Sequence, residues 1–329
     1  MARIGLVLGA GGVTGGAFHA GALAALEEAT GWDPRQAEVV IGTSAGSVLA
    51  ASLRAGLSAA DMAARAEGRP LSAEGRRVLE SVEEGPPPTP NPPPQTFRWG
   101  PPAAPAVLLR AARAPWAVRP TSVMAGLLPE GRISTADISA GVEALLGRRW
   151  PSLPMWITAV GLADGRLTVF GRRGAPAASP GAAVAASCAI PGWFAPVTIG
   201  GRRYVDGGAF SLTNAAELAG AGLDLVVVSS PMSQAPAGAG AYRAAGGRIW
   251  YLPALRQAAR GQLALESLAL RARGVPVLGL QPTVEDQLAM GGNPMSWRKR
   301  AAVARQVRES TLARLQRSGR PELALLRHA

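Results

Sequence analysis

One short stretch of the chain has the residue types and spacing that nucleophilic catalysis needs. The sequence Gly42-Thr43-Ser44-Ala45-Gly46 places one serine between two glycines, after an apolar run (39–41) and before an apolar helical pattern (47–53). A sharp strand-to-helix turn presents the serine hydroxyl, and glycines two positions before and after it let sheet and helix approach each other. Backbone amides at the start of the helix would favour negative charge on the Ser44 oxygen. The alternative is a glycine-rich turn with an incidental serine.

A serine nucleophile needs a base to accept its proton, and the chain offers few candidates. It has two histidines, His19 inside a predicted helix and His328 next to the last residue. His328 is the only candidate for a Ser-Asp-His triad, whereas His19 is more typical of a packing or capping residue. The other candidate is Asp206, which ends a predicted strand. A buried, hydrogen-bonded carboxylate can accept the proton, but taken alone the pair Asp206-Gly207 is more typical of a hairpin turn.

A second glycine-rich stretch, 9–16, follows a predicted strand (4–8) and precedes a helical pattern (17–29). A phosphate-binding Walker loop requires a lysine that is absent here, and a dinucleotide-binding loop would need glycine where Thr14 stands. An oxyanion hole needs only backbone N–H groups directed at the reacting carbonyl. Because the strand before Ser44 belongs to the same β-α-β unit, we expect this loop to lie beside Ser44.

Together these pieces resemble the patatin-like phospholipase family. The resemblance covers about residues 4–210 and rests on the order of the glycine-rich loop, the Ser44 turn and Asp206-Gly207-Gly208 after a hairpin. Segment 186–197 also resembles the family's stretch before its aspartate, and segment 285–295 resembles a bacterial branch of the family. The resemblance implies that Ser44 is the nucleophile and Asp206 its partner, in a dyad without histidine.

The resemblance also implies roles for glycines around this dyad. The oxyanion hole would be formed by backbone amides of Gly11 and Gly12, with Gly15 shaping the loop. Gly42, Gly46 and Gly207, which have no side chain, would let the backbone pass close to Ser44 and Asp206.

Two positions depart from the family's usual loop. Ala10 stands where the family usually has glycine, and Thr14 stands where it usually has arginine or lysine. Loss of the basic side chain removes a charge that could stabilise an oxyanion or a phosphate head group. Hydrolysis of an acyl ester still fits the loop, whereas the phospholipid assignment in particular is weakened.

The elements that position these residues alternate between strands and helices. Strands are predicted at 4–8, 39–41, 155–160, 167–170, 197–199, 203–205 and 223–229, and helices at 17–29, 47–53, 57–81, 134–146, 182–189 and 296–317. This order predicts an α/β fold with three layers, α/β/α, around a central and mainly parallel sheet. We expect one catalytic domain over residues 1–329.

A proline-rich insertion, 83–120, interrupts this alternation. Its run of prolines at 85–94 fits neither a regular helix nor a central strand, so an extended conformation is expected there. Apolar side chains follow, among them Phe97 and Trp116. The segment fits a lid or acyl-chain funnel over the site as well as it fits a surface linker.

Charge and composition restrict the partners more than they restrict the fold. The net charge is +12, almost all of it from arginine, with Lys299 the only lysine. Such an excess draws a protein toward anionic surfaces. The basic helix 296–317 could lie on an anionic membrane, although a solvated helix face is the better interpretation. We expect no nucleic acid partner, because aromatic residues make up only 5% and no binding module is recognised.

The sequence also bears on the compartment of the protein. Cys188 is the only cysteine, so no intramolecular disulfide forms and nothing requires an oxidising compartment. The first residues resemble a signal peptide, but the glycine cluster 9–16 interrupts the apolar region that such a peptide needs. No apolar run is long enough to predict a membrane-spanning helix. We therefore expect a cytoplasmic protein with peripheral membrane contact.

The predicted activity is serine hydrolysis of a lipid acyl ester, of the phospholipase A or lipid esterase type. It would proceed through an acyl-Ser44 intermediate with Asp206 as general base, and without metal or cofactor. One alternative is an acyltransferase, in which an alcohol or amine resolves the same intermediate. The other is a non-catalytic lipid-binding module that kept the fold.

Overall fold

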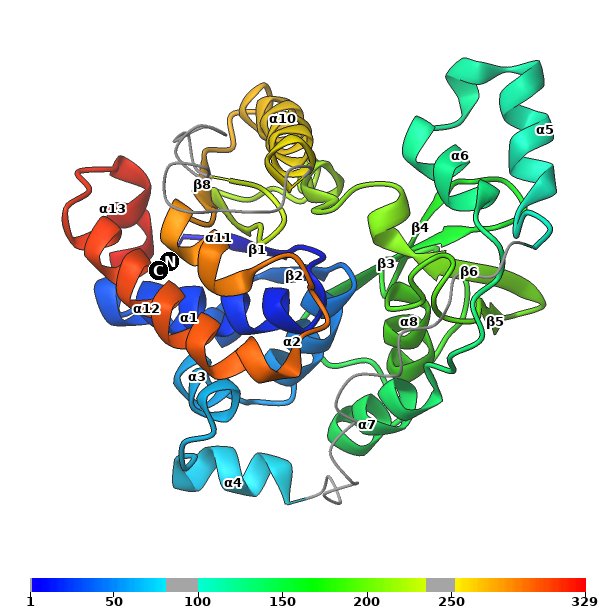
Figure 1. Cartoon of the computed structure of the whole chain (residues 1–329). Helices are drawn as coiled ribbons and strands as arrows, with labels where there is room; N and C mark the ends of the chain where they lie inside the picture. Colours follow the sequence, from blue (N-terminus) through cyan, green and yellow to red (C-terminus); the bar gives the residue numbers. More distant parts are fainter. Residues whose placement is uncertain (1, 81–99, 235–251) are drawn as a thin grey trace.

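Eight strands form one sheet in the computed structural model, which describes residues 2–80, 100–234 and 252–329 (Figure 1). The strands are β1 Ile4–Leu8, β2 Val39–Gly42, β3 Met155–Gly161, β4 Leu167–Phe170, β5 Val197–Ile199, β6 Arg202–Asp206, β7 Leu225–Ser229 and β8 Val277–Leu280. Their order is β5-β6-β3-β2-β1-β7-β8, with β4 also paired to β3. The five strands from β3 to β8 along this order are parallel, whereas β4, β5 and β6 pair antiparallel.

The parallel register decides where the two predicted catalytic turns lie. Leu8, the last residue of β1, pairs with Gly42, the last residue of β2. The carboxyl ends of these strands therefore meet at one edge of the sheet, as parallel strands require. β6 runs antiparallel to β3, with Asp206 opposite Ala159. The expected placement of the glycine-rich loop beside Ser44 is confirmed.

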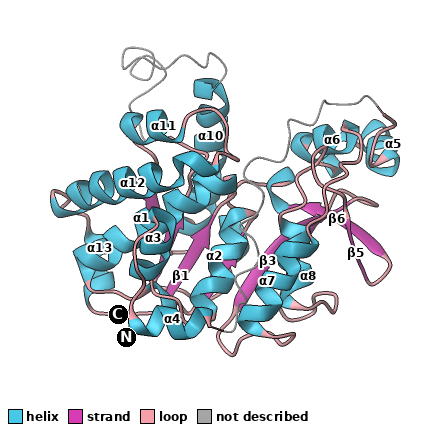
Figure 2. Cartoon of the chain, turned by 60° about the horizontal axis from the view of Figure 1, so that its bottom comes forward, coloured by secondary structure: helices cyan, strands magenta, loops and turns pink. Residues whose placement is uncertain are grey.

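Helices cover both faces of the sheet, which confirms the predicted α/β/α fold (Figure 2). One face packs against α1 Gly12–Thr30, α2 Ala45–Arg54, α3 Ala59–Glu67 and α12 Arg300–Gln316. The other face packs against α10 Leu252–Arg271. The remaining α-helices are α4 Ala73–Leu79, α5 Pro105–Arg113, α6 Pro120–Leu127, α7 Ala136–Leu146, α8 Pro180–Ser187, α11 Val284–Met290 and α13 Pro321–Arg327.

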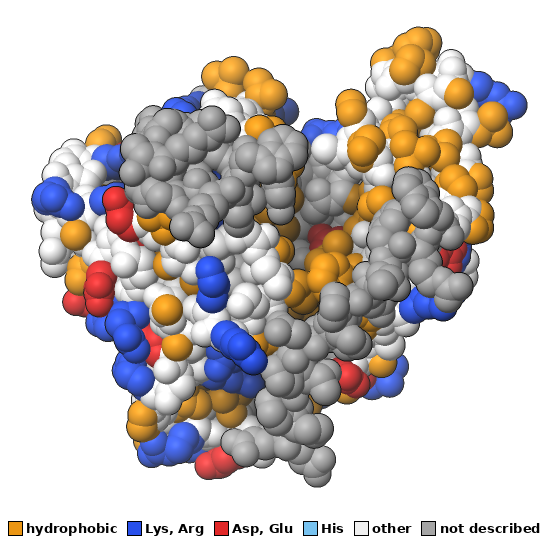
Figure 3. Space-filling view, viewed as in Figure 1, with side chains coloured by type: hydrophobic (Ala, Val, Ile, Leu, Met, Phe, Trp, Pro, Cys, Tyr) orange, Lys and Arg blue, Asp and Glu red, His pale blue; other side chains and the backbone are white. Residues whose placement is uncertain are grey.

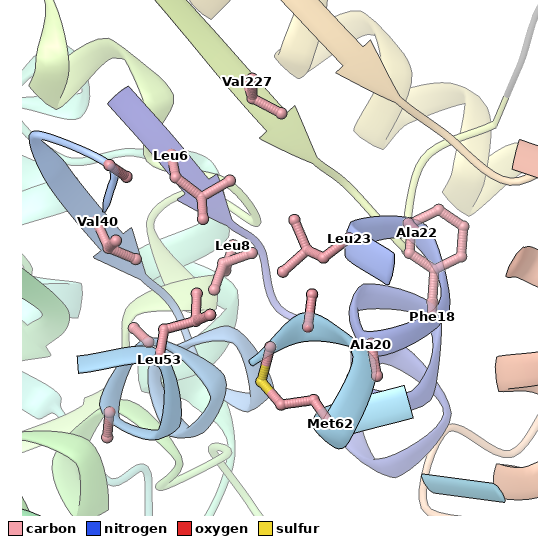
Figure 4. Close-up of a cluster of buried hydrophobic side chains, with 14 of the residues drawn as sticks. Leu6, Leu8, Phe18, Ala20, Ala22, Leu23, Val40, Leu53, Met62 and Val227 are labelled. Atoms are coloured by element: carbon pink, nitrogen blue, oxygen red, sulfur yellow. The ribbon is translucent and has the colours of Figure 1, made fainter. Parts of the chain in front are cut away.

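The core on the first face joins alternate side chains of the strands to the helices above them. Leu6 and Leu8 of β1 pack with Phe18 and Leu23 of α1, and Leu53 of α2 lies beside them (Figure 4). These side chains are almost fully buried. Burial of each contributes about 1.5–3 kcal/mol to the stability of the folded state. This core holds α1 and α2 against the ends of β1 and β2, where the site lies.

The start of α1 corrects one boundary expected from the sequence. The glycine-rich stretch 9–16 was expected to be a loop up to residue 16, but the helix begins at Gly12. Its first turn is fixed by contacts from far along the chain, because the Thr14 N–H donates to the Pro294 carbonyl at 2.9 Å. Glycine lowers helix propensity, and here tertiary contacts outweigh that preference.

The insertion is described only from residue 100 onward, so the extended conformation expected at 85–94 lies outside the described residues. Residues 100–129, called the insertion lobe below, contain the short helices α5 and α6. The lobe packs its buried side, including Val107 and Val118, against Val160 of β3 and Val205 of β6. It stands away from the rest of the molecule at the upper right of Figure 1.

The basic helix expected at 296–317 is present as α12, preceded by a short turn of 3-10 helix. Val303 and Val307 lie on one side as predicted and are fully buried against the core. Within the residues described, no helix is both long and apolar enough to span a membrane.

Candidate active site

Ser44 occupies a strained backbone position between β2 and α2. Its φ is 54° and its ψ is −123°, a combination that residues with a side chain rarely adopt. A Cβ at Gly46 would overlap the Leu8 carbonyl oxygen, and one at Gly42 would lie 2.5 Å from the Ser47 Cα. Only glycine fits at either position. The close approach of sheet and helix predicted from the pentapeptide is therefore present.

Two hydrogen bonds hold this strained peptide in place. The Ser44 N–H donates to the Ser187 Oγ at 2.9 Å, and the Ser47 Oγ donates to the Ser44 carbonyl at 2.6 Å. Ser187 is the last residue of α8 and is fully buried. Ser187, for which no role was predicted from the sequence, stabilises the backbone of Ser44 from another helix.

Asp206 lies beside Ser44 and is 4% exposed. Burial raises the pKa of Asp206 to about 6, against hydrogen bonds with the Ser44 side chain and the Gly208 N–H, which favour the charged form. The Gly208 N–H lies 2.7 Å from the Asp206 Oδ1. A Cβ at Gly207 would overlap the Thr158 Oγ1, so the turn after Asp206 also requires glycine. The structure thus brings the predicted nucleophile and its predicted partner together.

The glycine-rich turn at the start of α1 borders both residues. A Cβ at Gly46 would lie 2.8 Å from the Gly9 carbonyl oxygen, and one at Gly208 would lie 3.4 Å from the Ala10 Cβ. The turn therefore lies close to Gly46 through the Gly9 backbone and close to Gly208 through the Ala10 side chain. Thr14 is buried in the first turn of α1.

The N–H groups of Gly11 and Gly12 are candidate oxyanion donors. Gly12 is the first helical residue, so its N–H has no partner within the helix. In the described ranges of the chain, neither of these N–H groups donates to another residue. Gly12 has a φ of +59°, and a Cβ there would lie 2.8 Å from the Pro294 carbonyl oxygen. The Gly15 N–H donates to the Gly11 carbonyl at 2.9 Å, which closes the turn.

His19 serves the structure of this turn and not proton transfer. Its Nε2 donates to the Gly9 carbonyl at 2.8 Å, and its Nδ1 accepts from the Ser229 Oγ at 2.7 Å. Burial lowers the pKa of His19 to about 4, so the ring is neutral at pH 7. The interpretation of His19 as a packing residue holds. His328 is exposed at the end of α13, and no hydrogen bond joins either ring to Ser44 in the structure as described.

Asn214 joins the two catalytic turns through its side-chain amide. The Asn214 Nδ2 donates to the Thr43 Oγ1 at 3.0 Å and lies 3.4 Å from the Gly207 carbonyl oxygen. Thr43 precedes Ser44 and Gly207 follows Asp206, so one buried amide contacts the neighbour of each catalytic residue. Asn214 has a φ of +54°, a left-handed conformation that asparagine tolerates better than most residues.

A buried carboxylate fixes the loop that carries Asn214. Glu266 of α10 accepts hydrogen bonds from the hydroxyls of Ser211 and Thr213 and from the Ala215 N–H. Four groups in one network thereby connect α10 to the turn after Asp206. No role was predicted from the sequence for Asn214 or Glu266.

The Cys188 thiol lies near Ser44 but is not suited to act as a second nucleophile. Burial raises the pKa of the Cys188 thiol to about 12, and the nearby Asp206 charge acts in the same direction. A thiol that stays protonated is a poor nucleophile. Among the described residues, no three His, Cys, Asp or Glu side chains are grouped to hold a metal ion.

A family model matches most of the chain. The family model described as Patatin-like phospholipase matches residues 6–219, which is more than half of the chain. This range includes Gly11, Gly12, Ser44 and Asp206. No curated protein matches the chain.

Proposed function

The chain belongs to the patatin-like phospholipase family, whose members are generally lipid acyl hydrolases, and we propose on this premise that it hydrolyses lipid acyl esters through Ser44 and Asp206. The observation that carries the proposal is the strained Ser44 hydrogen-bonded to the buried Asp206. Two buried side chains of the lobe, Val107 and Val118, belong to one apolar cluster with Val205 and Ala209, which flank Asp206 in the chain, and this apolar surrounding supports an acyl substrate.

In the first half of the reaction, the Ser44 Oγ attacks the ester carbonyl carbon while its proton passes to the Asp206 carboxylate. The carbonyl oxygen becomes an oxyanion, which the N–H groups of Gly11 and Gly12 would stabilise. The intermediate then collapses: the bond to the leaving alcohol breaks, and that alcohol takes the proton from Asp206. The product of this half is acyl-Ser44.

In the second half, Asp206 accepts a proton from water as the water oxygen attacks the acyl carbon. The oxyanion forms again in the same place. When it collapses, the bond to the Ser44 Oγ breaks, and the Oγ recovers a proton from Asp206. A carboxylic acid leaves, and both side chains return to their starting states.

The raised pKa of Asp206 suits it to both halves. A carboxylate with an ordinary pKa is a weak base, and burial brings the pKa of Asp206 to about 6, nearer to the working pH. The group is then ionised at pH 7 and still basic enough to share a proton with Ser44. The N-terminus of α2, which begins at Ala45, adds a favourable field for negative charge on the Oγ.

Labelling with a fluorophosphonate tests the nucleophile directly. We expect wild-type protein and Ser52→Ala to be labelled, and Ser44→Ala to remain unlabelled. Ser52 lies on the same helix and donates only to the Val48 carbonyl, so its replacement is a matched control. Failure of the wild type to react, or labelling of Ser44→Ala, would refute the proposal.

Hydrolysis of esters with graded acyl length tests the base and the substrate class. Asp206→Asn should lose activity by several orders of magnitude, whereas Asp164→Asn, in the turn between β3 and β4, should retain it. Full activity in Asp206→Asn would remove the dyad. Product analysis with an added alcohol shows whether the acyl-enzyme is resolved by water or by transfer.

A further inference from the structure

Large hydrophobic side chains are exposed in two places that flank the site. In the described residues, eight such side chains stand exposed. Four are on the insertion lobe, namely Leu109, Trp116, Met124 and Leu127, and three are on α10, namely Leu255, Leu265 and Leu268. The eighth is Leu153, just before β3. Exposed apolar side chains gathered in this way mark an interaction surface, unlike scattered ones.

The two places project on the same side of the molecule. Figure 1 shows α10 at the top of the view and the helices α5 and α6 at the upper right, apart from each other. Figure 3 shows the surface hollowed between these projections, with hydrophobic side chains on the walls of the hollow and over the lobe. A flat apolar partner could therefore contact both projections while the hollow stays open between them.

The charge of the lobe is complementary to an anionic partner. Residues 100–129 contain Arg110, Arg113 and Arg119 and no aspartate or glutamate. Arg113 is exposed, and the described part of the chain supplies it with no ion-pair partner. Arginine beside tryptophan and leucine is the composition of surfaces that enter the head-group region of a bilayer.

Three of the four arginines of α12 bond within the protein, namely Arg300, Arg308 and Arg314, whereas Arg305 is exposed. Arg300 donates to the carbonyls of Arg65 and Ala66, and Arg308 pairs with Glu28 at 2.7 Å. The helix also buries its apolar side against the core. The membrane contact considered for this helix from the sequence is therefore better assigned to the lobe.

The lobe is connected to the loop that follows Asp206. The Arg119 guanidinium lies 3.9 Å from the centre of the Phe210 ring, and the Ser122 Oγ donates to the Ala209 carbonyl at 3.2 Å. Ala209 and Phe210 come three and four residues after Asp206. A partner bound to the lobe is therefore held next to the catalytic turn.

We infer that the insertion lobe and α10 form one lipid-contact face, which docks on the surface of an anionic bilayer with Trp116 as its principal anchor. Trp116 is 85% exposed and lies in a turn of 3-10 helix, Pro115–Ala117, between α5 and α6. Its ring would enter the interface while Arg113 meets lipid phosphates. The purpose of this docking, to bring lipid to Ser44, rests on the proposed function. The binding itself requires no catalysis.

Vesicle co-sedimentation tests the inference in a Ser44→Ala background, so that lipid is not consumed. The probes are vesicles of phosphatidylcholine alone and of phosphatidylcholine mixed with phosphatidylglycerol. We expect binding to the anionic vesicles that weakens with salt, and about a tenfold loss of partitioning in Trp116→Ala, from the apolar area no longer buried. Arg113→Gln should reduce binding to the anionic vesicles alone. Leu153→Ala, just before the start of β3, should bind like its parent.

The outcomes separate this inference from the proposed function. Equal binding by Trp116→Ala and Leu153→Ala would overturn the inference whether or not the protein hydrolyses esters. So would gel filtration that shows a dimer lost in Trp116→Ala, because the face would then be covered by a second copy. With Ser44 intact, Trp116→Ala should hydrolyse a water-soluble short ester at the parental rate and lose activity only on vesicles. A loss on both substrates would contradict a docking role.

Discussion

Asp206 combines a buried position with a task that requires charge. Its carboxylate loses hydration on folding. Hydrogen bonds from the Ser44 side chain and the Gly208 N–H offset part of this loss. The folded protein therefore favours the protonated acid more than the unfolded chain does. Two consequences follow, one for the rate of hydrolysis and one for stability.

The rate should depend on pH through the ionisation of Asp206. Only the carboxylate accepts the Ser44 proton, so kcat/KM for a non-ionisable ester should rise with pH through an apparent pKa of about 6 and then level off. Below that pKa the fall should be about tenfold for each pH unit. The measurement is a pH profile of kcat/KM on a soluble ester. A profile that is flat from about pH 5 to 8 would exclude Asp206 as the base.

The stability of the folded protein should fall as the pH rises, whereas the rate of hydrolysis rises. The folded pKa of Asp206 is raised from 3.8 to about 6, so wild-type protein loses stability as the pH rises through this interval. Asp206→Asn removes that loss and should be more stable above pH 6, by about 3 kcal/mol at most. The gain should vanish below pH 4. Urea unfolding of both proteins at the two ends of this range measures it, and equal stability at high pH would contradict the raised pKa.

Asn214→Asp tests whether the amide positions the dyad. Aspartate keeps the size of the side chain and tolerates the positive φ, but it has no N–H to donate to the Thr43 Oγ1. We expect kcat to fall by about 10- to 100-fold with a smaller change in KM, because a slight misplacement of reacting groups is costly. The readouts are kcat, KM and fluorophosphonate labelling rate. Unchanged kcat in a folded variant would limit Asn214 to a structural role.

The residues found by sequence and those missed differ in the range of their contacts. Ser44 and Asp206 each lie in a short local pattern with glycines at fixed spacing, so their candidacy could be read from the chain. Ser187 and Asn214 contact residues 143 and 171 positions away, and although Ser187 lies in the segment 186–197 that resembles the family, no local pattern indicates what either residue contacts. Nothing local distinguishes such partners before the fold brings them together.

At the scale of elements, the strands that were predicted lie closer to their observed bounds than the helix ends do, but β8 was not predicted. Runs of apolar residues at 4–8 and 155–160 have few alternatives, and both are strands within one residue of the expected bounds. The start of α1 was misplaced because glycines at 11, 12, 15 and 16 resemble a loop. The Pro294 carbonyl, far along the chain, accepts the hydrogen bond from the Thr14 N–H in the first turn of this helix.

Two glycines of α1 should respond oppositely to alanine. A Cβ at Gly21 would overlap the Ala304 carbonyl oxygen of α12, whereas the nearest atom to a Cβ at Gly16 is 3.7 Å away. Gly21→Ala should cost about 1–3 kcal/mol by forcing the helices apart, and Gly16→Ala should gain about 0.5–1 kcal/mol from helix propensity. Thermal or urea unfolding of the pair is the measurement. Stabilisation by both substitutions would refute the close packing of α1 on α12.

At the scale of the whole molecule, the segment after the family match completes the sheet. β7 pairs with β1 and β8 pairs with β7, and both strands lie beyond residue 219. The helices α12 and α13 add side chains such as Val307 and Leu323 to the main core. Without this segment, β1 would become an edge strand with an unpaired backbone.

A chain cut after residue 219 should therefore not fold, which also tests the proposal of one domain over residues 1–329. We expect it to aggregate or to show no cooperative unfolding by circular dichroism. Removal of residues 328–329 alone is the matched control and should leave folding and ester hydrolysis intact. A folded, active fragment 1–219 would show that the C-terminal part is dispensable, and lost activity in the short deletion would restore His328 as a candidate base.

The positive φ of Ser44 has a consequence for directed evolution. Glycine at this position would relieve the backbone strain, just as asparagine at position 206 would relieve the buried charge. A library sorted only for resistance to heat or protease would therefore accumulate substitutions at these two positions and drift toward inactive enzymes. Selection for a more robust catalyst has to retain an activity step in every round.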